Sequence, residues 1–137
     1  MKKILITGII VICQFAAAFS QTRADDIVGY YLAHTPTAKE KFQVEIFRAT
    51  NGTYEAKVVW VENPEFRQRL ESLQMRNLSF DPRAAEWRNG KMVYDGREYN
   101  VTASFTNDGK LRLRGFLGIS LFGRTMYWDK EMGLRKN

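Results

Sequence analysis

Side chains able to act as nucleophiles, bases or metal ligands are few in this sequence, and their spacing does not assemble a catalytic set. The 137 residues include one histidine, His34, and one cysteine, Cys13. A Ser-His-acid triad would have to use His34, which falls in a stretch with threonine and proline. A metal site would rest on carboxylates, and no D-x-D-x-D-G calcium loop occurs. We therefore predict no catalytic residue, no metal site, no cofactor and no enzymatic activity.

Two partial motifs overlap near the C-terminus. Residues 118–125 read G-I-S-L-F-G-R-T, which differs from the phosphate-binding loop G-x-x-x-x-G-K-[ST] because Arg124 replaces lysine. In the same stretch Ser120 lies between Gly118 and Gly123, one residue away from the G-x-S-x-G spacing of a nucleophile elbow. Both motifs need a helix to follow, whereas the next residues alternate as a strand does. We interpret the glycines as turn residues.

The first 20 residues have the three parts of a secretory signal peptide. Lys2 and Lys3 form a positive start, and a mainly apolar run over residues 4–19 follows. Ala18 and Ser20 fit a small-x-small cleavage pattern. A run of about 16 residues is short for a membrane span. We predict that residues 1–20 are cleaved and that the protein is exported, to the periplasm or outside the cell.

Cleavage there would leave one domain, 21–137, ending in a frayed tail from residue 132. Cys13 leaves with the leader, so the mature chain would have no disulfide and no thiol. The formal charge falls from +6 to +4 with the loss of two lysines, and the other basic residues are mixed with fifteen acids. Such a mixture is typical of a solvated surface, so we predict no nucleic-acid partner. Mean hydropathy is -0.38 even with the leader, so we predict no membrane span in the mature chain.

Apolar and polar residues alternate with period two over most of the mature chain, which indicates β-strands. Asn51-Gly52 and Asn107-Asp108-Gly109 lie between alternating segments and favour hairpins, because these residues tolerate positive φ. Further turns are expected at Asp81-Pro82, Asn89-Gly90 and Asp95-Gly96. The predicted strands are 27–32, 41–49, 53–61, 76–80, 91–94, 99–106, 111–114 and 124–129.

The alternation breaks near 63–75. Asn63-Pro64 has the residue types of an N-cap and a first helical position, and Phe66, Leu70 and Leu73 fall at helical spacing. We predict either one short helix or a long loop here. About eight short antiparallel strands with turns between them predict an all-β fold, either a small barrel or a sandwich. A barrel of this strand number can pack its interior or hold one small ligand.

Several segments together carry a family resemblance. Residues 27–32 read I-V-G-Y-Y-L, and residues 114–128 read R-G-F-L-G-I-S-L-F-G-R-T-M-Y-W. With K-V-V-W at 57–60, N-P at 63–64 and M-V-Y-D at 92–95, they make the chain resemble the domain of unknown function 2147 family over nearly all of residues 25–131. That family comprises small exported bacterial proteins, and the resemblance implies a lipocalin-like (calycin-type) barrel. It implies no activity, since none is established for the family.

The resemblance also implies how the barrel closes. Lipocalin-like barrels commonly pack a first-strand aromatic residue against a late arginine, and the matching residues here are Tyr31 and Arg124. The family usually has tryptophan at the position of Tyr31. An arginine over a ring face contributes about 0.5–2 kcal/mol. We therefore expect Arg124→Ala to lower the thermal stability of the domain.

Aromatic residues are the most suggestive feature of the predicted interior. By alternation, the inward-facing set that would line a ligand pocket is Phe42, Val44, Tyr54, Val58, Trp60, Tyr99, Val101, Phe105 and Met126. A register error of one residue would reverse the assignment.

Two hypotheses about function stay open. The first is a non-enzymatic barrel that binds a small apolar or amphipathic molecule, a hydrophobic ligand held among the inward-facing residues. The second is a packed structural or interaction module of the cell envelope, which has no ligand cavity and docks onto an envelope protein partner. A cavity of roughly 300 Å³ or more would separate the two.

Overall fold

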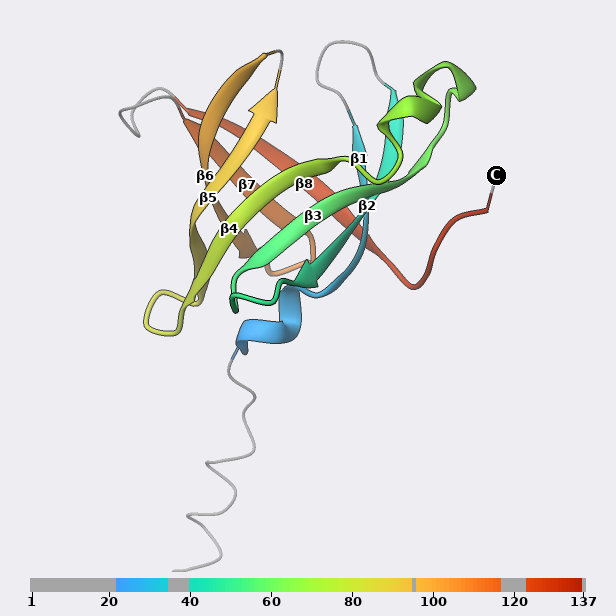
Figure 1. Ribbon diagram of the computed structural model, residues 1–137. Coiled ribbons are helices and arrows are strands. Elements are labelled where there is room, and N and C mark those ends of the chain that lie inside the picture. The colour runs from blue at the N-terminus through green and yellow to red at the C-terminus, as the bar shows by residue number, and fades with distance from the viewer. Residues whose placement is uncertain (1–21, 35–39, 95, 117–122, 137) are drawn as a thin grey trace, which may run out of the picture.

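The computed structural model describes residues 22–34, 40–94, 96–116 and 123–136 (Figure 1). Within these ranges, eight strands form one closed antiparallel barrel in the order in which they follow along the chain. The strands are β1 (Gly29–His34), β2 (Lys41–Arg48), β3 (Tyr54–Val61), β4 (Leu73–Asp81), β5 (Glu86–Tyr94), β6 (Arg97–Phe105), β7 (Leu111–Phe116) and β8 (Gly123–Glu131). The 3-10 helices η1 (Ala24–Ile27) and η2 (Pro64–Arg69) accompany them. The predicted all-β barrel is confirmed.

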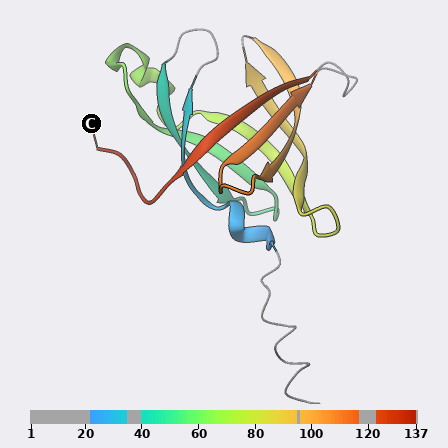
Figure 2. The same cartoon turned by 180° about the vertical axis from the view of Figure 1, so that it is seen from behind.

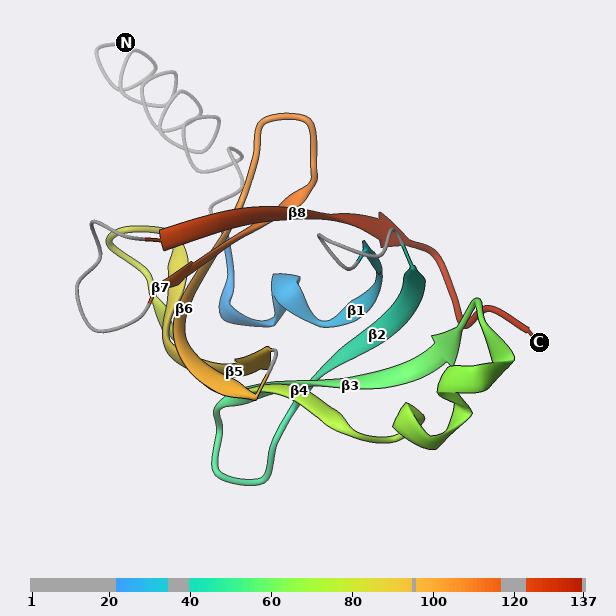
Figure 3. The same ribbon diagram turned by 90° about the horizontal axis from the view of Figure 1, so that it is seen from above.

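The pairing of β1 with β8 closes the ring of strands. Its register runs from Tyr30 opposite Glu131 to Leu32 opposite Asp129, so this seam is short. By comparison, β7 pairs with β8 from Leu111 to Phe116. Figure 2 shows the β7–β8 side of the barrel, and Figure 3 shows the ring of strands from above.

The two ends of the barrel differ. η1 lies at the lower end in Figure 1, where the β2–β3, β4–β5 and β6–β7 turns are also found. We call this the η1 end. At the upper end β1 finishes, β2 begins, and η2 stands at the rim (Figures 1 and 3). We call this opposite end, between His34, Lys41, η2 and Gly123, the mouth.

The hairpin turns follow the expected residues. Asn51-Gly52 joins β2 to β3, with Gly52 at a φ of 86°, and Asn107-Asp108-Gly109 joins β6 to β7, with Gly109 at 84°. The turn predicted at Asn89-Gly90 is wrong, because both residues lie inside β5. There Asn89 has a φ of 65°, and the register with β6 skips between Trp87 and Gly90, which is a β-bulge.

Other boundaries also differ from the prediction. β5 begins at Glu86 rather than Lys91, because the bulge interrupts the alternation by which a strand is recognised. Ile27 belongs to η1 instead of the first strand. Of the two alternatives near 63–75, the short helix is correct, and the Asn63 side chain accepts a hydrogen bond from the Glu65 N–H at 3.0 Å. The signal peptide predicted at 1–20 and the glycine stretch at 118–122 lie outside the described residues.

The interior of the barrel at and above η1 is densely packed. Trp87 is fully buried there, and the centroids of the Phe80 and Phe105 rings lie 5.0 and 5.6 Å from the centroid of its ring. The other large, fully buried side chains are Tyr31, Ile27, Ile46, Met75, Leu78, Leu111, Leu113, Val44, Val58 and Val101.

Candidate functional site

The η1 end is sealed by hydrogen bonds between barrel side chains and the backbone of η1. The indole nitrogen of Trp87 donates to the Ala24 carbonyl at 2.9 Å, and the Tyr31 hydroxyl donates to the Ile27 carbonyl at 2.8 Å. The Tyr54 hydroxyl donates to the Asp25 carboxylate. Ile27 itself is fully buried. η1 therefore covers the packed interior of the barrel at this end.

The same contacts perturb two tyrosines. Burial, together with the hydrogen bond and the negative charge of Asp25, raises the pKa of Tyr54 to about 12. Burial, helped by the charge of Asp26, raises the pKa of Tyr31 well above its usual value. In both cases the neutral phenol is favoured because the charged form would be poorly solvated. These hydroxyls are structural donors at neutral pH.

The expected closing pair of Tyr31 and Arg124 does not form. Arg124 is exposed and lies opposite Gly115 near the mouth, whereas Tyr31 lies opposite Lys130 near η1. Lys130 follows Arg124 by six positions along β8, which is about 20 Å of strand. The ring of Tyr31 instead approaches Trp128, with 6.5 Å between centroids, and the Lys130 ammonium lies 6.0 Å from the Tyr31 ring.

The predicted inward-facing set is brought together with one exception. Trp60 lies on the outer face, because the β2–β3 register shifts between Gln43 and Val44 and thereby turns Val61 inward in its place. A single bulge reverses the alternation of every residue beyond it. By register, the others share the inner face of the barrel: Phe42, Val44, Tyr54, Val58, Tyr99, Val101, Phe105 and Met126.

Burial of the inner face changes along the barrel. Val44, Tyr54, Val58 and Val101 are buried, as the packed core requires. Nearer the mouth, Phe42, Tyr99 and Met126 are half-buried, and so is Phe105 at the η1 end. Residues 35–39 and 117–122, which connect strands at this end, lie outside the described part of the chain.

η2 contributes further apolar surface at the mouth. Phe66 and Leu70 are half-buried and pack against the core cluster, although no residue of η2 itself is fully buried. The Arg69 guanidinium lies 5.2 Å from the Phe66 ring centre and covers part of it. Sequence spacing indicated these apolar positions, but not that they pack beside β3 at this end of the barrel.

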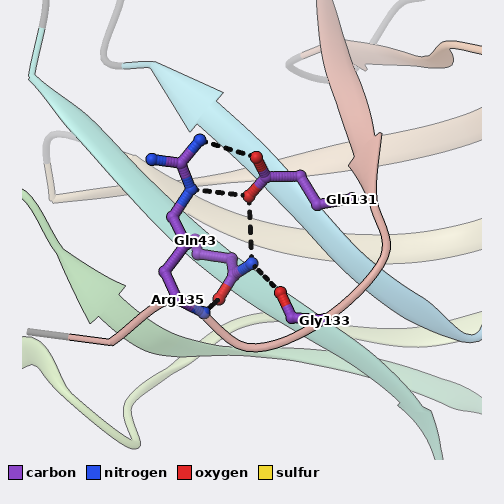
Figure 4. A network of polar contacts seen from close by, with 4 residues as sticks. All are labelled: Gln43, Glu131, Gly133 and Arg135. Carbon is purple, nitrogen blue, oxygen red and sulfur yellow. Dashed lines mark hydrogen bonds and ion pairs between the residues drawn. The ribbon is translucent and has the colours of Figure 1, made fainter.

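The C-terminal segment is fastened to β2, which corrects the frayed tail expected from residue 132. The Gln43 amide is fully buried; it donates to the Gly133 carbonyl at 2.8 Å and to Glu131 at 3.0 Å (Figure 4). It also accepts from the Arg135 N–H at 2.9 Å. Hydrogen bonds from Arg135 hold the pKa of Glu131 below its usual value. We call residues 131–135 the clasp.

Comparison with known proteins agrees with the fold. A model of the family of uncharacterized proteins conserved in bacteria, DUF2147, matches residues 29–130. The chain belongs to this family. Among solved structures it is similar to protein HP1028 from the human pathogen Helicobacter pylori, described as a member of the lipocalin family, with 19% identity and a TM-score of 0.63 over 78% of this chain and 84% of that one. A search of curated proteins found no match.

The likeness to HP1028 shows the fold alone, and it confirms the expected lipocalin-like barrel. The DUF2147 match covers the strands of the barrel but not the segments on either side of them. Residues 29–130 take in the strands almost entirely but exclude η1 and the clasp. The segment that covers the η1 end and the clasp thus lie outside the matched region. No activity comes with the family.

The described residues of this DUF2147 barrel contain neither a group of metal ligands nor a membrane-spanning helix. Across residues 22–34, 40–94, 96–116 and 123–136, no three His, Cys, Asp or Glu side chains are grouped so that they could hold a metal ion. His34, the only histidine, is exposed at the end of β1. In the same ranges no helix has the length and apolar character needed to cross a membrane.

Proposed function

We propose that this protein is an exported, non-enzymatic barrel that binds one small apolar or amphipathic molecule at its mouth. The observation that carries the proposal is the half-burial of Phe42, Tyr99 and Met126, which face inward at the end that η1 does not seal. Covering apolar surface contributes about 25 cal/mol per Å². A ligand that covers these side chains gains affinity from the part of their apolar surface that is otherwise exposed to solvent.

The geometry favours a short ligand over a long one. Trp87, Tyr31 and their buried neighbours fill the barrel above η1, so an acyl chain or ring would stop at the level of the packed core. Two hollows of about 490 and 530 Å³ exist elsewhere, and neither is lined by Phe42, Tyr99 or Met126. The ligand would therefore sit shallowly and keep a polar group in solvent.

A fluorescence titration tests the proposal. Anilinonaphthalene sulfonate and lauric acid are added separately to the purified protein and to two phenylalanine variants. Phe42→Ala, at the mouth, is expected to weaken binding by about tenfold. Phe47→Ala is the matched control, because Phe47 is a half-buried residue on the outer face of the same strand. Absence of binding, or equal affinity in both variants, would contradict the proposal.

Export is part of the proposal and rests on the leader pattern of residues 1–20. Cleavage after Ser20 would leave Arg23 to Ile27 intact, and these residues build the η1 seal. N-terminal sequencing of protein recovered from the periplasm or the medium is expected to begin at Gln21. A chain that still starts at Met1 would refute the cleavage.

A packed interaction module of the envelope is the alternative, and the filled interior around Trp87 favours it. Native mass spectrometry of protein purified from its own host separates the two functions. A co-purified small molecule supports the binding barrel. A bare chain mass together with a stoichiometric protein partner would replace the binding barrel by the interaction module.

A further inference from the structure

An open hollow of about 490 Å³ lies on the outer wall of the barrel, across β4, β5, β6 and β7. Arg88, Lys91, Thr102 and Phe116 contribute to it. Each is next in sequence to a buried, inward-facing residue, so these side chains face away from the core. The hollow is separate from the mouth, and its size is in the range of small-molecule sites, about 300–1,000 Å³.

Two opposed bulges shape this hollow. Asn77 on β4 and Asn89 on β5 have φ angles of 67° and 65°, and the Asn77 amide donates to the Asn89 carbonyl at 3.0 Å. Beside them, Gly90 lies so close to Leu78 that an added Cβ would come within 2.6 Å of a Leu78 methyl carbon. The backbone at Gly90 therefore packs directly against the Leu78 side chain, with no room for a side chain between them. Non-glycine residues with positive φ are uncommon, and they occur often at binding and active sites, where the surrounding structure holds them in that conformation.

Most side chains that line the hollow are polar or positively charged. The lining includes two cations, three carboxamides, one hydroxyl and one aromatic ring, and no carboxylate. Arg88 is engaged by Glu86 and Asp81, at 2.5 and 3.2 Å. The Lys91 ammonium donates a hydrogen bond to the Asn100 side-chain oxygen. No carboxylate of the described residues forms an ion pair with Lys91. Lys91 is thus the cation best placed to receive an anionic ligand.

We propose that this hollow binds a carbohydrate of monosaccharide size that carries a carboxylate. The Lys91 ammonium pairs with the ligand carboxylate. The amides of Asn77, Asn89 and Asn100 both donate and accept, which matches the hydroxyls of a sugar. Phe116 offers a ring against which the C–H face of the sugar packs. A bare inorganic anion would use Lys91 alone and leave the amides and the ring unused.

The test is an NMR titration of the ¹⁵N-labelled protein with D-glucuronate, compared with D-glucose and with acetate. Glucuronate up to about 20 mM is expected to shift the backbone amides of 88–91 and 100–102, since a millimolar complex would be nearly saturated there. Glucose lacks the carboxylate and acetate lacks the sugar, so each should bind about tenfold more weakly or less.

Variants locate the binding. Lys91→Gln and Asn100→Ala are each expected to weaken glucuronate binding about tenfold. Lys110→Gln is the control, because it removes the same charge from a surface lysine that pairs with Asp129 outside the hollow. The proposal is overturned if wild-type protein shows no localised shift, if acetate or glucose binds as well as glucuronate, or if Lys110→Gln has the same effect as Lys91→Gln. None of these results bears on ligand binding at the mouth.

Discussion

The backbone N–H of Arg135 donates to the side-chain oxygen of Gln43 at 2.9 Å, although 92 residues separate them in sequence. This bond, with the one from Gln43 to the Gly133 carbonyl, ties the clasp to β2 across the short β1–β8 seam. The Arg135 guanidinium also lies 5.1 Å from the ring of Trp60, the residue that the bulge turns outward. The buried side chain of Gln43 therefore joins β2 to the segment that follows β8.

Gln43→Ala is expected to lower the free energy of unfolding by about 1–3 kcal/mol, because it removes the partner of two backbone groups and of Glu131. Urea denaturation measures the change. Gln74→Ala is the control, since Gln74 is a half-buried strand residue whose side chain makes no hydrogen bond to the described residues. Equal losses in the two variants would mean that the clasp does not contribute to stability.

Ile27→Ala should cost about 2–5 kcal/mol, because the fully buried side chain of η1 fills the end of the barrel and its removal leaves a cavity. Val28→Ala, the neighbouring residue with 41% of its surface exposed, should change stability by less than about 0.5 kcal/mol. Thermal or urea unfolding of both variants tests the seal. Similar values for both would show that η1 is not part of the folded core.

Arg124→Ala is expected to leave thermal stability nearly unchanged, contrary to the expectation from the family resemblance, because Arg124 is exposed and far from Tyr31. Lys130→Ala should cost about 0.5–1 kcal/mol, since the Lys130 ammonium lies over the Tyr31 and Phe105 rings and donates to the Asp26 carbonyl. A larger loss for Arg124→Ala than for Lys130→Ala would restore the original pairing.

Stability is expected to fall as the pH rises from about 10 to about 12. The unfolded chain releases the Tyr54 proton near pH 10, whereas the folded protein keeps it up to a pKa of about 12. Deprotonation thus favours the unfolded state in this window, and below it the contribution is fully present. Urea midpoints at about pH 9 and about pH 11 measure the slope. Tyr54→Phe should reduce the slope, with Tyr31 supplying the remainder, and an unchanged slope would contradict the assignment to Tyr54.

Gly90→Ala should destabilise the fold by about 1–3 kcal/mol, because the new methyl group would lie 2.6 Å from a Leu78 carbon and 3.1 Å from the Val101 carbonyl oxygen. Gly133→Ala is the control, since nothing lies within 4 Å of its added Cβ. Differential scanning calorimetry compares the two. Tolerance of Gly90→Ala would show that the close packing of Gly90 against Leu78 is not required.

The sequence alone determined the class of fold and most of the strands. Period-two alternation and Asn-Gly or Asp-Gly pairs act locally, because each residue's φ preference and polarity are its own properties. For that reason the hairpins at Asn51-Gly52 and Asn107-Asp108-Gly109 were predicted correctly. Inward-facing residues followed wherever the alternation ran unbroken, as from Tyr54 to Val58 on β3.

Only the tertiary structure decided what closes the barrel and what shapes its surfaces. Trp60 turned outward and Asn89-Gly90 became a bulge, because the register depends on the strand opposite and one extra residue reverses every side chain beyond it. The Trp87 side chain is buried in the core and donates a hydrogen bond to the Ala24 carbonyl. The Gln43 side chain is buried where the clasp covers it. These partners are distant along the chain, and no local pattern encodes which distant segment will cover a given strand.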